Sequence, residues 1–160
     1  MVKIPNPWGN ADAKPELRLP EATLNFRKMS APPLTSLEEL GRLNITAWLY
    51  RDRQGIEKIQ VNPNTTIAEL RRIYGPASTP DAETGFHSEG NAAEWFRTRP
   101  DLRVVQIFTE RAPCANCAAL LQKYFANVST YYYYRRAAWR GPHNELIRKA
   151  GEALKSAYGL

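Results

Sequence analysis

The sequence predicts an α/β domain built on a mixed β-sheet of four to five strands sandwiched by helices. Two observations carry this prediction. From 87 to 158, helical and strand-like patterns alternate, which is typical of a sheet covered by helices. Before them, two short segments rich in β-branched and aromatic residues, 43–50 and 56–61, are separated by a turn containing Gly55, which indicates a β-hairpin.

The composition agrees with a single domain. The chain has 160 residues, of which 43% are hydrophobic and 24% charged, as in a soluble globular protein. No charge-free stretch approaches the roughly 18 apolar residues that a membrane span needs. Residues 1–14 have no apolar run of the kind found in a secretory signal peptide. We therefore expect no membrane partner and, if the protein leaves its cell, export by another route.

The elements follow in order. Residues 1–33 hold six of the 12 prolines, which predicts an extended lead-in, with the domain itself at 34–160. The lead-in either wraps the domain through Leu17, Leu19, Leu24 and Phe26 or is a linker. Ser36 and Glu39 form a capping-box pattern for a short helix that Gly41 ends. After the hairpin, a second capping box predicts a helix at 67–74, followed by a flexible stretch at 77–85. The alternating region then comprises helix 87–97, strand 102–109, helix 113–125, strand 128–135 and helix 142–158.

Positive charge is concentrated in one part of the chain. The net charge is +6, and the segment 97–140 contains eight basic residues and two acidic ones, so it accounts for the whole excess. Such a region suits a polyanion such as nucleic acid, because phosphate contacts release condensed counterions. The alternative is a solvated surface on which arginine serves solubility.

Cys114 and Cys117 are the two cysteines, and they lie in the sequence Pro-Cys-Ala-Asn-Cys. A disulfide across so short a loop would remove little entropy from the unfolded chain, so the pair indicates redox or metal chemistry. Both cysteines fall in the first turn of a predicted helix, and His87 precedes another. One histidine and two cysteines suit zinc and leave a fourth position open for water, as in catalytic zinc sites. Glu89 shares the inward face of its helix, where a lone carboxylate is costly.

These residues also carry a family resemblance. His87-Ser88-Glu89, followed by the Pro-Cys-x-x-Cys motif that begins at Pro113, resembles the signature of the zinc-dependent cytidine deaminase superfamily. The resemblance covers about 43–136, and the small basic domain is most similar to deaminase domains of bacterial polymorphic toxins. It implies one Zn²⁺ per chain held by His87, Cys114 and Cys117. It also implies that Glu89 is the catalytic proton carrier and that cytosine is converted to uracil.

The resemblance adds substrate-binding candidates. An asparagine after the second strand contacts the sugar in relatives, and Asn62 or Asn64 occupies that place, although an Asn-Pro turn explains both equally well. Phe86, next to His87, is a further candidate. In the block from 131 to 140, tyrosines and arginines suit a single strand of nucleic acid, with ordinary β-propensity of tyrosine as the alternative. The residues concerned are Tyr131, Tyr133, Arg135 and Arg136. Relatives have a fifth strand after the fourth, and 137–160 shows no pattern for one.

The resulting expectation is hydrolytic deamination of cytosine in nucleic acid, with single-stranded DNA as the preferred substrate. The domain would be a toxin or effector that acts in the cytoplasm of a recipient cell and is countered by an immunity protein; without export it would be cytoplasmic. Three alternatives stay open. They are a deaminase of free nucleosides, a thioredoxin-like oxidoreductase using the Cys-x-x-Cys pair, and a zinc-stabilised binding module without catalysis.

Overall fold

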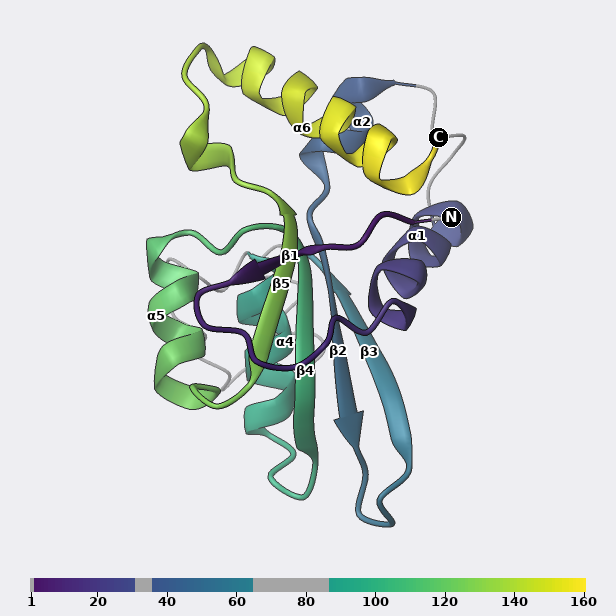
Figure 1. The fold of residues 1–160 in the computed structure, drawn as a ribbon, viewed down its shortest axis with the longest axis vertical. Coiled ribbons are helices and arrows are strands. Elements are labelled where there is room, and N and C mark those ends of the chain that lie inside the picture. The colour runs from purple at the N-terminus through teal and green to yellow at the C-terminus, as the bar shows by residue number, and fades with distance from the viewer. Residues whose placement is uncertain (1, 31–35, 65–86) are drawn as a thin grey trace.

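The structure, a computed structural model, describes residues 2–30, 36–64 and 87–160. Its centre is a five-stranded mixed sheet with the strand order β1-β5-β4-β2-β3 (Figure 1). β4 and β5 run parallel, and the other neighbouring pairs are antiparallel. The strands are β1 (Asn6–Trp8), β2 (Ile45–Arg51), β3 (Glu57–Pro63), β4 (Arg103–Arg111) and β5 (Ser129–Tyr134). The mixed α/β sheet that the sequence predicts is confirmed.

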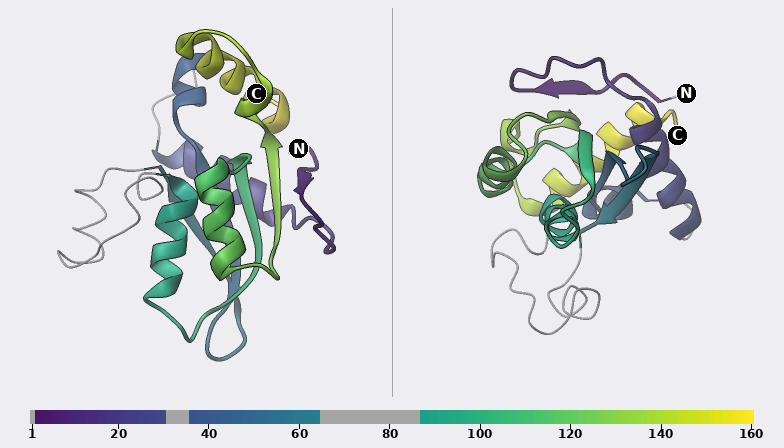
Figure 2. Two further views of the ribbon diagram at one scale, coloured as in Figure 1. Left: turned by 90° about the vertical axis from the view of Figure 1, so that its left-hand side faces the viewer. Right: turned by 90° about the horizontal axis from the view of Figure 1, so that it is seen from below.

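Helices cover both faces of this sheet and one of its ends (Figures 1 and 2). α4 and α5 lie on one face, α1 lies on the other, and α2 and α6 pack together beyond the end of β5. The helices are α1 (Arg18–Ser30), α2 (Leu37–Arg42), α4 (Ser88–Arg97), α5 (Ala115–Tyr124), the short 3₁₀ helix η1 (Arg136–Ala138) and α6 (His143–Tyr158). The predicted helix at 67–74 and the stretch at 77–85 lie outside the described residues. Among the described helices, none combines the length and apolar character that crossing a membrane requires.

Alternation along β2 divides the core into two layers. Trp48 is fully buried and stacks on Phe96 of α4, with ring centroids 5.1 Å apart. Leu49, the next residue, points to the opposite face and joins a cluster that includes Leu19 of α1. Successive strand residues face opposite sides of a sheet, so one strand supplies both layers. α4 is thereby packed firmly against the sheet, and its first turn is held in a fixed position.

The N-terminal segment packs on the domain, and Leu19 lies in one of its core clusters. The expectation of an extended lead-in is wrong for Arg18–Ser30, because this segment is a helix in which Pro20 lies in the first turn, where a missing N–H costs nothing. Arg27 of α1 is 1% exposed and forms an ion pair with Glu110 of β4 at 2.7 Å. The lead-in also supplies the fifth strand: β1 pairs with the edge of β5, with Pro7 opposite Tyr131.

The helix predicted from Ser36 is present as α2, but Gly41 does not end it. The helix continues to Arg42, and Gly41 lies where α2 crosses α6. A Cβ atom on Gly41 would lie 1.8 Å from the carbonyl oxygen of Ile147, and one on Gly151 would lie 2.0 Å from that of Leu37. The two backbones therefore touch, and glycine is needed at both positions for packing.

Replacing Gly151 with alanine is expected to destabilise the protein, because the added methyl group would force α2 and α6 apart. Overpacking of this kind costs about 1–3 kcal/mol. Urea unfolding followed by circular dichroism measures the effect. Lys149→Ala, an exposed change on the same helix, should leave the urea midpoint unchanged. A Gly151→Ala midpoint equal to that of the wild type would contradict the close crossing.

Candidate metal centre

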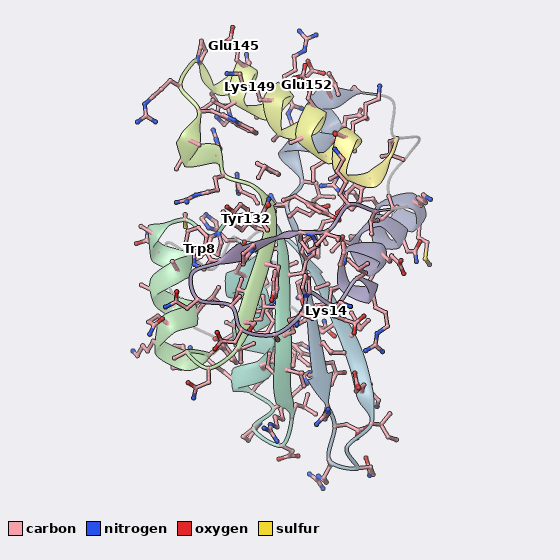
Figure 3. The ribbon with its side chains drawn as sticks, viewed as in Figure 1. Trp8, Lys14, Tyr132, Glu145, Lys149 and Glu152 are labelled. Carbon is pink, nitrogen blue, oxygen red and sulfur yellow. The ribbon has the colours of Figure 1, made fainter. Side chains whose placement is uncertain are left out.

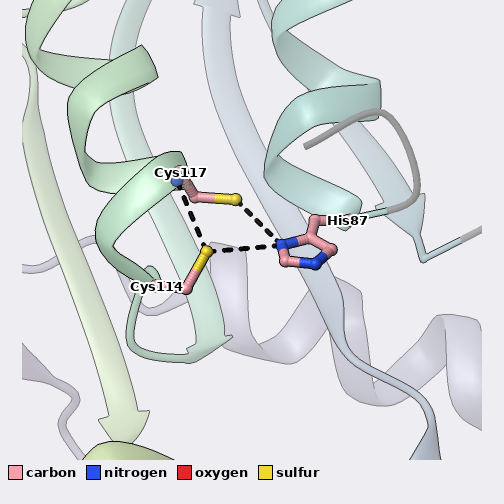
Figure 4. A group of neighbouring side chains, drawn as sticks. All are labelled: His87, Cys114 and Cys117. Carbon is pink, nitrogen blue, oxygen red and sulfur yellow. Dashed lines mark hydrogen bonds between the residues drawn. The ribbon is translucent and has the colours of Figure 1, made fainter. Parts of the chain in front are cut away.

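The predicted metal ligands come together at the starts of two neighbouring helices. His87 is the N-cap residue of α4, and Cys114 is the N-cap residue of α5, with Cys117 one turn further on. α4 and α5 pack side by side on one face of the sheet, so their N-terminal ends meet (Figure 4). His87 and Cys117 are 30 positions apart in the sequence. The chain between them runs along α4 and back along β4 to the start of α5.

The three ligand atoms lie close enough together for one metal ion to contact all of them. Nδ1 of His87 lies 3.1 Å from Sγ of Cys117 and 3.5 Å from Sγ of Cys114. All three atoms lie within 4.8 Å of one another. Tetrahedral zinc with ordinary Zn–S and Zn–N bonds separates such ligand atoms by roughly 3.4–3.8 Å. The 3.5 Å distance falls in this range, and the 3.1 Å distance is slightly shorter. The donor set and its spacing therefore suit a metal ion that takes nitrogen and sulfur ligands.

The electrostatics of the cluster also suit a cation. Cys117 is fully buried, whereas Cys114 is exposed and His87 half-buried. Burial, together with the nearby negative charge of Glu89, raises the pKa of the Cys117 thiol. A thiolate at this position consequently needs a positive charge beside it. The exposed side of the cluster leaves room for a small molecule to approach.

Glu89 lies in the first turn of α4 and is 2% exposed, on the inward face that its spacing predicts. Its Oε1 atom accepts a hydrogen bond from Oγ1 of Thr109 at 2.5 Å and another from Nδ2 of Asn44 at 3.2 Å. Two donors on one carboxylate oxygen offset part of the cost of burying the group. They also fix the rotamer of Glu89 beside Cys117.

Asn44 is a member of this site that the sequence analysis missed. It is 2% exposed, and its Oδ1 atom accepts a hydrogen bond from the backbone N–H of Arg111 at 3.0 Å. Its Nδ2 group donates to Oγ of Ser88 at 3.0 Å as well as to Glu89. Asn44 thus joins the start of β2, the end of β4 and the first turn of α4. Asn44 lies in a loop before the hairpin, where no local sequence pattern indicates a functional residue. No such pattern indicates Thr109 either.

Of the two candidate asparagines near the end of the hairpin, Asn64 is connected to the site and Asn62 is not. Oδ1 of Asn64 accepts a hydrogen bond from the backbone N–H of Asn44 at 3.2 Å, and its own N–H donates to the Asn44 carbonyl at 3.0 Å. Asn62 is paired with Thr46 across the hairpin and accepts a hydrogen bond from Gln60. Asn64 therefore holds Asn44 in place.

The structure places Tyr131 and Tyr133 away from the metal ligands, on the face of the sheet that α1 covers. Tyr131 is 3% exposed, and its hydroxyl donates to the carbonyl of Ala13. Tyr133 packs against Phe108 and Tyr158, and its hydroxyl donates to the carbonyl of Lys3 at 2.7 Å. Both side chains are thus engaged in packing within the fold, with Tyr131 buried and Tyr133 half-buried. Phe86 lies outside the described residues.

A cavity of about 460 Å³ opens directly beside the metal ligands and includes His87 and Cys114 in its wall. The rest of its lining includes three arginines and two tryptophans, namely Arg111, Arg135, Arg136, Trp8 and Trp139. No carboxylate lines it among the described residues. Arg135 and Arg136, both predicted from the sequence, therefore reach the site, and the aromatic surface comes from tryptophans in place of the predicted tyrosines.

Comparison with known proteins adds no identification. No model of a protein family matches this sequence, and no curated protein matches it either.

Proposed function

We propose that this protein is a zinc-dependent deaminase that hydrolyses cytosine to uracil in nucleic acid. The observation that supports it best is one arrangement: three nitrogen and sulfur ligand atoms within 4.8 Å, a buried carboxylate next to them, and a cavity alongside whose lining includes three arginines. Three protein ligands leave one coordination position for water, which is the pattern of catalytic zinc. His87, Cys114 and Cys117 would hold the ion.

When bound, zinc supplies Lewis-acid activation of water near neutral pH. Glu89 then performs the proton transfers. Its carboxylate takes a proton from the water that adds to C4 of cytosine, and it delivers that proton to N3. It next takes the proton of the new C4 hydroxyl and passes it to the amino group on C4, which leaves as ammonia while the C4 carbonyl of uracil forms. Asn44 and Thr109 hold Oε1, which leaves the second carboxylate oxygen for these transfers.

The cavity favours a polymer over a free nucleoside. A cytosine can reach the metal ligands only when it is out of a base stack, so an unpaired strand avoids an unstacking cost of a few kcal/mol. Phosphates on either side of the target would meet the guanidinium groups of Arg111, Arg135 and Arg136. Single-stranded DNA is therefore our proposed substrate, and uracil in a genome would make the activity toxic. A toxin of this kind acts in the cytoplasm of a recipient cell and needs an immunity protein in its producer.

Two rival functions give different results in metal analysis. A thioredoxin-like oxidoreductase would present titratable thiols without metal, and it leaves His87 and Glu89 without a role. A purely structural zinc module would need a fourth protein ligand, whereas the metal-ligating group within the described residues has three members. One bound zinc per chain together with no reactive thiol would exclude the redox function.

The reaction and the substrate class are tested together with defined oligonucleotides. The zinc-loaded protein is incubated with single-stranded DNA, duplex DNA, single-stranded RNA and free cytidine, and the products are sequenced or separated by chromatography. We expect C-to-U changes first in single-stranded DNA. Turnover of free cytidine with no change in any oligonucleotide would favour a nucleoside deaminase.

Changing Arg135 and Arg136 together to alanine is expected to weaken binding of single-stranded DNA and to flatten its salt dependence. Each lost phosphate contact removes about 0.7 from the slope of log K against log salt for single strands. Fluorescence anisotropy across a salt series measures both quantities. The matched control changes Arg99 and Arg103, two exposed arginines outside the cavity. Equal slopes for the two double variants would show that the cavity arginines hold no phosphate.

A further inference from the structure

Trp8 reaches the cavity from a part of the chain that the deaminase motif does not include. It ends β1, which lies along the outer edge of β5, and it lines the cavity together with His87 and Cys114. Figure 3 shows Trp8 beside Tyr132, near the N-terminal end of α5. The ring centroids of Trp8 and Tyr132 are 5.8 Å apart, in an edge-to-face arrangement.

Arg135 lies over this indole. Its guanidinium carbon is 4.9 Å from the centre of the Trp8 ring, within the range of a cation–π contact. A guanidinium stacked in this way is held flat while its N–H groups at the edge stay free to bind an oxyanion. The pair therefore offers two kinds of contact in one place, namely hydrogen-bond donors for a phosphate and an aromatic surface for a base.

The N-terminal segment that carries Trp8 is held in place on both sides of β1. Before the strand, the Lys3 N–H donates to the carbonyl of Ala157 at 2.8 Å. After the strand, the Glu16 N–H donates to Oε1 of Gln106 at 2.7 Å. The hydroxyls of Tyr131 and Tyr133 bind carbonyls of the same segment. These two tyrosines thus help to position β1, which gives them a role beside the site without contact to the substrate.

We propose that β1 completes the substrate site, with Trp8 stacking on the base that flanks the target cytosine and Arg135 binding the adjoining phosphate. The inference rests on the proposed function for the identity of the target base, but the binding surface itself does not depend on catalysis. It identifies the ligand as a nucleotide within a single strand, because a free nucleoside has neither a flanking base nor a bridging phosphate. The N-terminal segment thereby determines which substrates the site accepts.

The test measures binding alone, in the Glu89→Gln background, with a fluorescent single-stranded oligonucleotide that contains one cytosine. Trp8→Leu keeps an apolar side chain in the wall but removes the ring, and Trp8→Phe keeps a ring. From the range measured for base–aromatic stacking, we expect Trp8→Leu to raise Kd about fivefold to a hundredfold. We expect Trp8→Phe to stay near the parent value.

Two controls make this result specific. The first is Tyr124→Ala, which removes an exposed ring paired with Arg97, at 5.1 Å, outside the cavity; its Kd should be unchanged. The second is an oligonucleotide with abasic sites on both sides of the cytosine, for which Trp8→Leu and the parent should bind equally. Equal affinity of Trp8→Leu and the parent for the intact strand would overturn the inference. Equal losses of affinity in Trp8→Leu and Trp8→Phe, or a full Trp8 effect on the abasic strand, would overturn it as well.

These outcomes are distinguishable from failure of the proposed function. If the wild-type protein deaminates no cytosine but Trp8→Leu still loses affinity for the intact strand, the result supports the nucleotide-binding surface and refutes the proposed reaction. If deamination occurs and the Trp8 variants bind like the parent, the reaction stands and β1 has no part in substrate binding.

Discussion

A Cys117→Ser protein is expected to lose its zinc. Cys117 is fully buried between the two helix starts, and a serine hydroxyl at this position is a poor ligand for zinc compared with a thiolate. The free energy of unfolding should fall as well, because metal binding is coupled to folding when the ligands come from separate elements. Zinc content after dialysis, measured by mass spectrometry, should drop from one ion per chain to a small fraction of one.

Ala115→Ser is the matched control for this substitution. It places a hydroxyl in the same first turn of α5, on an exposed residue that is not a ligand. It should retain one zinc per chain and the wild-type urea midpoint. A Cys117→Ser protein that keeps its full zinc content would refute the ligand assignment.

Glu89→Gln is expected to keep zinc and fold while losing deaminase activity. The glutamine side-chain oxygen can still accept the hydrogen bonds from Thr109 and Asn44, but the amide cannot carry a proton between water and cytosine. General acid–base catalysis contributes typically about 10²–10⁴-fold, so kcat should fall by at least that range. Single-turnover assays on an oligonucleotide measure the loss.

The choice of glutamine matters for interpretation. Glu89→Ala also removes the acceptor, which leaves the buried donors of Asn44 and Thr109 without this partner and costs about 1–3 kcal/mol of stability. We therefore expect Glu89→Ala to be inactive and less stable, and Glu89→Gln to be inactive alone. Glu94→Gln, a neutralising change later on α4, should retain activity. Near wild-type turnover by Glu89→Gln would mean that another group moves the protons.

The ligand cluster could be predicted from the sequence because its information is local. The sequence around His87 and around Cys114 indicates the cap position, the helical spacing and the ligand chemistry. The alternation of helices and strands then places the two helix starts at one end of a sheet. The inward face of Glu89 follows from the same spacing. What the sequence does not contain is the distance between the two starts, which depends on how α4 and α5 pack.

The residues that were missed act through long-range contacts. Asn44 and Thr109 meet Glu89 only because β2 and β4 are neighbours in the sheet, and each looks like an ordinary polar residue in its own segment. Trp8 lies in a proline-rich stretch, where composition conceals a strand only three residues long. The face to which each tyrosine in β5 points depends on the register of the sheet. Alternation of side chains along the strand does not by itself indicate which face α1 covers.

The most direct test of the central claim is a deamination assay in water enriched in heavy oxygen. Zinc-loaded wild-type protein and Glu89→Gln are each incubated with a single-stranded DNA oligonucleotide that contains one cytosine, and the product is analysed by mass spectrometry. We predict that the wild type converts the cytosine to uracil with one heavy oxygen atom at C4 and releases ammonia, and that Glu89→Gln leaves the oligonucleotide unchanged. The claim would be contradicted if the wild-type protein, with one zinc bound per chain, left the amino group on the cytosine of the oligonucleotide.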